Sequence, residues 1–488
     1  MRVDARRTFS RHVVLLALAL AVGGGHVQAQ DTRPRIEDFR LDLSPAAVDE
    51  ARVLNARSLA TQAYLWGLPA FLYFRQTTEI KQGRLHAAPG EEPFGGWILL
   101  RKLASPSDRT NVMPNVDTLY GAAYLLLDKQ GPVVLSIPRV KDRYYSVALH
   151  DAYFNTFAVV GTRTTNGDAA NILILPPDHR GPPPAGFTRV IRAPTRDIAL
   201  FQRVFVRDAA DVAAVHSIQD RIRLAPLSAW KQPVKTFPRV DSSEFDVREP
   251  VRQIRDPLTY FAIVNAHTCR NRPAGDYAAL VSAMSQAGLG PCASLPDTPA
   301  VRNALADGAR GAQEILNARL TSGEVRNGWR IPDPNTGRAS PDYIGRAVVQ
   351  ITQIASFSPD EAMYFTGRLD KDGAPLDGRN TYELTFPAGG GPPVDPRAFW
   401  SLTLYDAADN LLVANPIDRY LLRPTTPGLK PNPDGSLTLY VGSRKPAAAP
   451  AGNWLPAPEG RFIVVLRTYM PSRAVQTGQW IPPPLVRQ

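Results

Sequence analysis

One short segment occurs twice in this chain, and the repeat constrains the fold more than any other feature. Tyr144–Ala152 (YYSVALHDA) aligns without a gap with Phe399–Ala407 (FWSLTLYDA), 399 − 144 = 255 positions further along. Each copy follows a separate run that ends in proline, at Pro138 and at Pro387. The repeat therefore predicts two related β-domains.

Alternation within the first copy divides its side chains between two faces of a strand. Tyr145, Val147 and Leu149 share one face, and Ser146 and His150 lie on the other. The second copy alternates in the same way. We expect the apolar face of each copy to pack in a domain core. We expect the more polar faces to meet across a hollow shared by the two domains.

Composition agrees with a β-rich chain. A chain of 488 residues is too long to fold around one small core. Its 46 prolines and 35 glycines favour short strands joined by turns. We predict a mainly β protein with α additions, in which a helical segment joins two jelly-roll-like β-sandwich domains. A helix is expected from Pro45, with a break at Gly67–Pro69. The expected order is a signal peptide (1–29), N-terminal helices (30–90), a first β-domain (91–225), a linker and helical segment (226–360) and a second β-domain (361–488).

Several longer motifs resemble two bacterial families of unknown function. MPNVDTLY, DRYY and VGTRT resemble family 1254, whereas FWSLTLYD, NPIDRY, DGSLTLY, NWLPAP and LRTYMP resemble family 1214, its usual C-terminal companion. Together these motifs cover most of residues 45–485. The resemblance implies two jelly-roll-like β-domains plus helices, and it implies no particular reaction.

The amino terminus has the pattern of an export signal. A basic start precedes the apolar run Val13–Val22, and Val27-Gln28-Ala29 suits a cleavage site. We expect a periplasmic or secreted protein, exported by the general secretory route in preference to the twin-arginine route that Arg6-Arg7 also suggests. No later segment is long and apolar enough to predict a transmembrane helix.

The two cysteines are Cys269 and Cys292, separated by 292 − 269 = 23 positions. In an oxidising compartment we expect them to form a disulfide, with two buried thiols as the alternative.

The candidate catalytic residues are Asp117, Tyr120 and His150. Asp117 follows a polar loop and could act as a general base near Tyr120, or hold a ligand or a metal together with Asn115. Alternatively, Asn115 and Asp117 cap backbone amides in an Asx-turn. His150 titrates near neutral pH in its unperturbed state, but a lone hydrogen-bonded histidine is more often structural.

Arginines in strands are the candidate anion anchors. Arg467 shares a strand face with Tyr469, so its half-buried charge needs either a carboxylate-bearing ligand or an internal Asp or Glu. The same two interpretations apply to Arg163, Arg419, Tyr420, Asn453 and Trp454.

Other classes of function lack their motifs. The net charge of +11 is scattered, with no basic stripe for nucleic acid. No nucleotide-binding loop or closely spaced metal-ligand set is present, so we predict no cofactor and no metal. Two hypotheses remain. In the first, the protein binds a small, carboxylate-bearing organic ligand between its β-domains and could hydrolyse that ligand without a cofactor. In the second, it is a non-catalytic envelope module that has a structural role or binds partners. A homo-oligomer is compatible with either.

Overall fold

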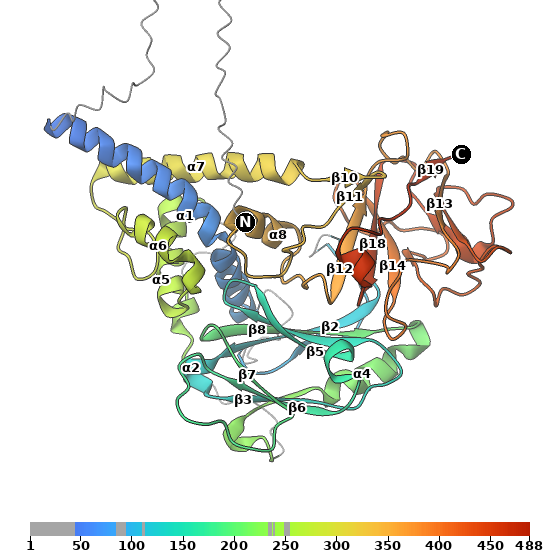
Figure 1. The fold of residues 1–488 in the computed structure, drawn as a ribbon, viewed down its shortest axis with the longest axis horizontal. Coiled ribbons are helices and arrows are strands. Elements are labelled where there is room, and N and C mark those ends of the chain that lie inside the picture. Colours follow the sequence, from blue (N-terminus) through green and yellow to red (C-terminus); the bar gives the residue numbers. More distant parts are fainter. Residues whose placement is uncertain (1–43, 84–93, 110–112, 233–236, 238–239, 248–253) are drawn as a thin grey trace, which may run out of the picture. The chain divides into compact units, whose positions relative to one another are not determined.

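The computed structural model describes residues 44–83, 94–109, 113–232, 237, 240–247 and 254–488. The predicted signal peptide lies outside the described residues. These residues are rich in β-sheet and carry additional helices, as predicted (Figure 1). None of the helices they form is long and apolar enough to cross a membrane.

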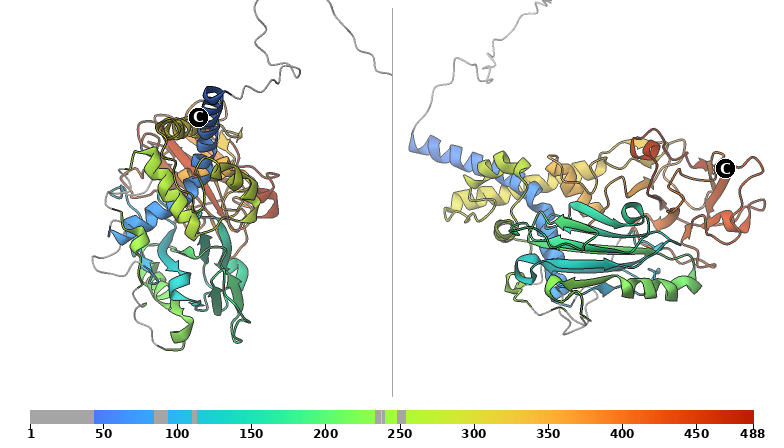
Figure 2. Two further views of the ribbon diagram at one scale, coloured as in Figure 1. Left: turned by 90° about the vertical axis from the view of Figure 1, so that its left-hand side faces the viewer. Right: turned by 60° about the horizontal axis from the view of Figure 1, so that its bottom comes forward.

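The first half of the chain forms two sheets that face each other (Figure 2). One sheet has the order β1 (Ile98–Leu99), β2 (Thr118–Leu126), β8 (Asp197–Phe205), β4 (Tyr145–Asp151) and β5 (Thr156–Gly161). The other has the order β7 (Arg189–Arg192), β6 (Ala170–Leu175), β3 (Val133–Ile137) and β9 (Arg223–Pro226). All neighbouring strands are antiparallel except β6 and β7.

The last third of the chain repeats this arrangement. One sheet has the order β10 (Val325–Arg326), β11 (Trp329–Arg330), β12 (Ala362–Gly367), β18 (Phe462–Tyr469), β14 (Trp400–Asp406) and β15 (Leu421–Leu422). The other has the order β17 (Trp454–Pro456), β16 (Leu437–Gly442), β13 (Tyr382–Phe386) and β19 (Val486–Arg487). Here β16 and β17 form the parallel pair. Apart from β10, strand order and direction match those of the first half, and the repeated segments occupy the corresponding strands β4 and β14.

Each pair of sheets encloses its own apolar core. Tyr145, Val147 and Leu149 of β4 pack in the first core, as their alternation predicted. Their counterparts in β14 pack in the second core. Burial of these aromatic and aliphatic side chains on one face of each strand accounts for the register of both domains.

The opposite faces of β4 and β14 are buried as well. Tyr144 and Ala148 of the first domain pack with Phe399 and Tyr469 of the second. These faces therefore do not line an open hollow at these residues, because each sheet covers the other. They form a layer between the domains, which we call the polar layer because several of its side chains are polar.

Most of the longer helices form a further apolar cluster with one end of the first sheet, whereas Val215 and Ile218 of α4 pack in the first β core. The longer ones are α1 (Pro45–Lys81), α4 (Val212–Arg221), α5 (Pro257–Arg270), α6 (Ala278–Ser285), α7 (Pro299–Thr321) and α8 (Tyr343–Thr352). Short helices are α2 (Leu127–Gln130), α3 (Thr162–Thr165) and α9 (Arg473–Gln476). The predicted break at Gly67–Pro69 is wrong, since α1 continues through it. Close packing explains this: a Cβ on Gly67 would lie 2.7 Å from Val264 Cγ1, so tertiary contacts hold the helix through the proline.

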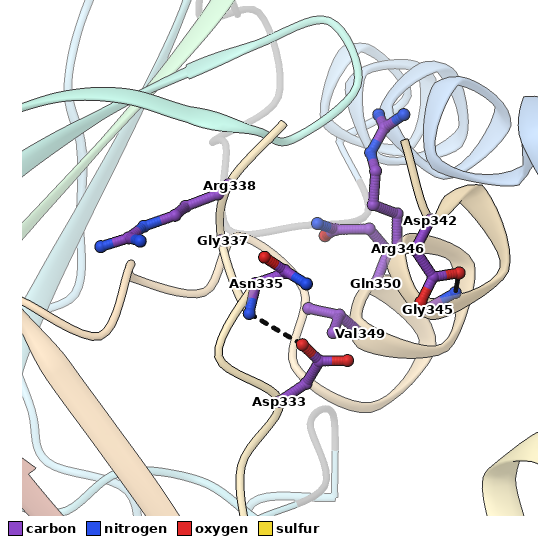
Figure 3. A pocket seen from close by; sticks show the side chains of 9 residues that line it. All are labelled: Asp333, Asn335, Gly337, Arg338, Asp342, Gly345, Arg346, Val349 and Gln350. Atoms are coloured by element: carbon purple, nitrogen blue, oxygen red, sulfur yellow. Dashed lines mark hydrogen bonds between the residues drawn. The ribbon is translucent and has the colours of Figure 1, made fainter. Parts of the chain in front are cut away.

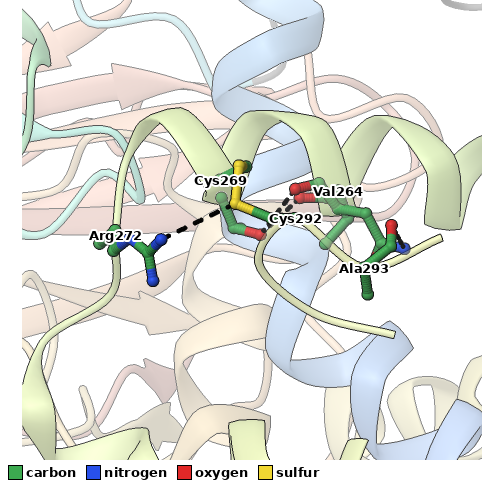
Figure 4. Close-up of a disulfide and its surroundings, with 7 residues drawn as sticks. Val264, Cys269, Arg272, Cys292 and Ala293 are labelled. Carbon is green, nitrogen blue, oxygen red and sulfur yellow. Dashed lines mark hydrogen bonds between the residues drawn. A yellow bond between two sulfur atoms is a disulfide. The ribbon is translucent and has the colours of Figure 1, made fainter. Parts of the chain in front are cut away.

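The predicted disulfide is present between Cys269 and Cys292 (Figure 4). It links the end of α5 to the loop that follows α6, with the two Cα atoms 4.5 Å apart.

Candidate functional site

Two equivalent rows of side chains face each other across the polar layer. In the first domain, Tyr120 of β2, Arg203 of β8 and Ser146 of β4 lie directly opposite one another; we call them the first row. In the second domain, Tyr364, Arg467 and Ser401 occupy the same places on β12, β18 and β14 and form the second row. The repeat therefore extends from one segment to a Tyr–Arg–Ser row in each domain.

In the second row, Arg467 and Ser401 are both hydrogen-bonded. Arg467 donates to Thr403 Oγ1 at 2.9 Å, to Tyr405 Oη at 2.8 Å and to the Met113 carbonyl at 3.1 Å. Ser401 Oγ donates to Asp117 Oδ2 at 2.6 Å. The second row thus has its polar partners within the protein.

Asp117 joins the two domains. Besides Ser401, its carboxylate accepts a hydrogen bond from Arg423 Nη1 at 3.3 Å, and Asp117 is fully buried. Asn115 Oδ1 accepts a hydrogen bond from the Asp117 amide at 2.6 Å, as expected in an Asx-turn, and Asn115 Nδ2 donates to Tyr469 Oη at 2.7 Å. The Asp117 side chain, in contrast, bonds to side chains and not to backbone amides. The predicted residues Asn115, Asp117 and Tyr469 therefore lie together in the polar layer.

Glu361 is the counterpart of Asp117 in the second domain. The segments Asp117–Tyr120 and Glu361–Tyr364 align as D-x-x-Y and E-x-x-Y, and Glu361 is also fully buried. Its carboxylate accepts from Tyr144 Oη at 2.7 Å and from Arg163 Nε at 2.6 Å. Burial raises the pKa of Glu361, and these two donors oppose that rise. The predicted anchor Arg163 is therefore held by Glu361.

The first row, in contrast, has few partners. Arg203 is 5% exposed, and the one hydrogen bond that it makes with the described residues is from Nη2 to the Ala355 carbonyl at 3.3 Å. Among the described residues, Arg203 Nε and Nη1 and Ser146 Oγ have no hydrogen-bond partner, and no carboxylate forms an ion pair with Arg203. The guanidinium carbon lies 5.0 Å from the Tyr120 ring centre and 4.1 Å from that of Phe357.

The tyrosines around Arg203 do not supply the missing negative charge. Burial raises the pKa of Tyr364 and of Tyr469, so both are neutral phenols at pH 7. An arginine side chain keeps its proton in proteins. Arg203 is thus a buried cation without a counter-ion in the part of the chain that the structure describes.

His150 lies on the same face of β4 as Ser146 and is fully buried. Neither ring nitrogen has a hydrogen-bond partner among the described side chains and backbone. The ring lies edge-on to Phe201, with ring centres 5.4 Å apart. Burial, with a smaller contribution from the charge of Arg203, lowers the pKa of His150 to about 3, so the imidazole is neutral at pH 7.

The other predicted binding residues lie in the second domain and are engaged there. Arg419 donates to the Trp454 carbonyl at 2.9 Å, and Tyr420 donates to Asp418 at 2.9 Å. Asn453 Nδ2 donates to two backbone carbonyls at 2.8 Å, and Trp454 Nε1 donates to the Gly442 carbonyl at 3.0 Å. None of these bonds reaches the first row.

Two pockets lie apart from both rows. One, lined by residues of α8 and the preceding loop, has a volume of about 10 Å³, which is room for one water molecule (Figure 3). The other has about 240 Å³ and is an open surface hollow beside Arg139, Lys141 and Arg221. Within the described ranges, no group of three or more His, Cys, Asp or Glu side chains could hold a metal ion.

Sequence reasoning missed Arg203, Ser401, Arg423 and Glu361. Extending the repeat beyond β4 and β14 identifies two of them. FQRVF in β8 aligns with VLRTY in β18, which pairs Arg203 with Arg467, and the D-x-x-Y and E-x-x-Y segments pair Asp117 with Glu361.

These features define a chain with two copies of one β-domain that share a buried polar layer. Residues 97–226 match the family described as "Protein of unknown function (DUF1254)". Residues 361–473 match "Protein of unknown function (DUF1214)". The chain therefore carries a DUF1254 domain followed by a DUF1214 domain, as its motifs predicted.

One solved structure shows that this fold occurs elsewhere, and a second resembles the chain only weakly. The VPA0106 protein from Vibrio parahaemolyticus is 21% identical, with a TM-score of 0.67 over 89% of this chain and 100% of its own. An uncharacterised protein from Burkholderia cenocepacia is 13% identical, with a TM-score of 0.40 over 91% of this chain and 96% of its own. A comparison with curated proteins finds no match.

Proposed function

We propose that this protein binds a small carboxylate-bearing organic molecule in the polar layer, with Arg203 as the anion-binding residue. The observation that carries the proposal is the buried guanidinium without a counter-ion. An unpaired buried charge costs several kcal/mol, and a bound carboxylate would offset that cost. Arg203 Nε and Nη1 supply unused donors for charge-assisted hydrogen bonds.

The surroundings of Arg203 suit an organic anion. The rings of Tyr120 and Phe357 both lie close to the guanidinium, which limits its movement before a ligand arrives. Tyr120 and Tyr364 are only half-buried, so the polar layer approaches the surface at their end of the two rows. We place the route of entry there.

We also propose a cellular location and a more detailed description of the fold. The disulfide fits an oxidising compartment, which supports a periplasmic or secreted protein. Two facing sheets with the same strand order in each half support the description as two jelly-roll-like β-sandwiches. Residues 91–225 and 361–488 remain our domain boundaries.

Binding without turnover has more support than hydrolysis. A hydrolase needs a general base, and Asp117 was the candidate. Both of its carboxylate oxygens already accept hydrogen bonds, from Ser401 and Arg423. This pairing supports a structural role for Asp117.

The second candidate function is a non-catalytic envelope module that binds partners. The observation in its favour is the pair of buried contacts made by Asp117 and Glu361, which hold the two domains together without any ligand. In that case water, rather than an organic anion, would occupy the free donors of Arg203.

Thermal unfolding of the mature chain (residues 30–488) tests the proposal. Sodium propionate is compared with sodium chloride at equal ionic strength. A ligand at a hundred times its Kd adds about 2.7 kcal/mol to the stability of the folded state, so propionate should raise Tm. Arg203→Met should remove this rise, and Arg163→Met, in which the alternative anchor is lost, should retain it.

Two results would overturn the proposal. The first is a wild-type Tm that is the same in propionate and in chloride. The second is a rise in Tm of equal size in wild type and Arg203→Met.

A further inference from the structure

His150 gives the polar layer a second group that lacks a partner. The side chain is fully buried, and neither nitrogen makes a hydrogen bond with the described residues. Buried polar groups are nearly always hydrogen-bonded. The backbone of Ser356, Ala355 and Ala148 opposes the lowering of the His150 pKa, but a carbonyl can only accept a hydrogen bond. The acceptor nitrogen of the ring therefore still calls for a donor, which a carboxylate bound at Arg203 does not supply.

Backbone contacts bring His150 and Arg203 to the same place. Thr156 is opposite His150 in the β4–β5 ladder, and Thr156 Oγ1 donates to the Ser356 carbonyl at 2.9 Å. The adjacent Ala355 carbonyl accepts the hydrogen bond from Arg203. Residues 355–356 therefore lie beside both side chains, and Ser356 Oγ is itself buried without a partner in the described chain.

The chemistry of the ring indicates what the missing partner is. Because His150 stays neutral, one nitrogen donates a hydrogen bond and the other accepts one. A second carboxylate would satisfy only the donor. A hydroxyl group can donate to the acceptor or accept from the donor, and Ser356 offers a further hydroxyl beside the ring.

We infer that the ligand is a small hydroxy acid, with its carboxylate at Arg203 and its hydroxyl at His150. This inference rests on the proposed function and names the class of ligand that the same site binds. No covalent step is involved: the protein recognises both groups by hydrogen bonds alone.

Matched ligand pairs test the inference in wild-type protein. Isothermal titration compares acetate with glycolate and propionate with lactate, so that each pair differs by one hydroxyl group. One hydrogen bond in a buried site should make each hydroxy acid bind roughly fivefold to tenfold more tightly than its partner.

Variants then locate the preference. His150→Phe keeps a ring against Phe201 but removes both nitrogens, so it should lose the preference for glycolate over acetate. The control is His267→Phe, which changes another buried histidine, one that already contacts the Ala152 carbonyl at 3.2 Å. This control should keep the preference.

The outcomes separate the two proposals. Equal affinities for acetate and glycolate in wild-type protein would overturn the hydroxy-acid inference and leave the anion site at Arg203 intact. A preference that survives in His150→Phe would also overturn it. If neither acid binds, both proposals fail. The wild-type comparison decides the matter even if a variant does not fold.

Discussion

The two rows of the polar layer have the same residues in the same places, yet they differ in how many of their hydrogen bonds are made. In the second row, Arg467 has three hydrogen-bond partners and Ser401 is bonded to Asp117. In the first row, Arg203 has one partner and Ser146 Oγ has none among the described residues. Duplication thus provided two similar sites, and only one of them is completed by the protein itself.

The difference arises from the acids that precede the rows. Asp117 reaches across the layer to Ser401 in the second row. Glu361, its counterpart, binds Tyr144 and Arg163, two side chains outside the first row. The first row therefore lacks the carboxylate that its symmetry partner has, and this absence is the physical basis for proposing a carboxylate from outside.

The largest expected contrast is between the two arginines. Arg467→Met leaves the Tyr405 hydroxyl and the Met113 carbonyl with unmade hydrogen bonds and should reduce the free energy of unfolding by about 3–5 kcal/mol. Arg203→Met removes an uncompensated charge and should raise the free energy of unfolding of the ligand-free protein by about 1–4 kcal/mol. Urea unfolding of both variants measures this. Equal losses would mean that the first row is also completed within the protein.

The two acids should differ as well. Asp117→Asn leaves Arg423 buried without its counter-charge and should cost about 3 kcal/mol. Glu361→Gln should cost only about 1 kcal/mol, because Arg163 keeps Asp360 at 2.8 Å and burial already disfavours the charged form of Glu361. The same urea measurements apply. If Asp117→Asn leaves stability unchanged, Asp117 is free for a role in chemistry.

His150 and Tyr405 are counterparts that should respond differently to pH. The pKa of His150 is about 3 in the folded protein, below the ordinary value of 6.5, so the unfolded state binds more protons between these values. Stability is therefore fully present above pH 6.5 and falls as the pH is lowered toward 3. Between pH 7 and pH 5 the loss should be about 2 kcal/mol.

Unfolding in urea at both pH values tests this prediction. His150→Phe should lose that part of the pH dependence, and Tyr405→Phe should retain it, since Tyr405 does not titrate in this range. An unchanged pH dependence in His150→Phe would show that the histidine is protonated or exposed in the folded state.

Much of the fold could be predicted from the sequence because a repeat is a local signal. Tyr144–Ala152 and Phe399–Ala407 identified two related domains, and alternation identified the side chains of each core. The layer between the domains was harder. Alternation shows that Ser146 and His150 face away from the core, but it does not show that the second domain covers them.

The candidate site was only partly predictable for a similar reason. Arg467 and Asp117 attracted attention as charges near apolar strands, whereas Arg203 lies in a strand whose other residues are mostly apolar. Whether such an arginine has a partner depends on contacts between residues far apart in the sequence. Asp117 and Ser401, for example, are 284 positions apart. A single sequence contains no local sign of such a contact.

The smallest expected contrast in stability is between Trp97 and Trp329. These two residues are counterparts in the two domains, and each follows a glycine. Trp329 Nε1 donates to the Pro483 carbonyl at 2.7 Å, but Trp97 Nε1 is buried without a partner in the described chain. Both Trp→Phe variants lose ring volume, and Trp329→Phe also loses a hydrogen bond, so it should be less stable than Trp97→Phe by about 1 kcal/mol. Thermal unfolding of the two variants measures the difference. Equal stabilities would restrict this contrast to the polar layer. The expected difference would extend it to the residue before β1 and to its counterpart in β11.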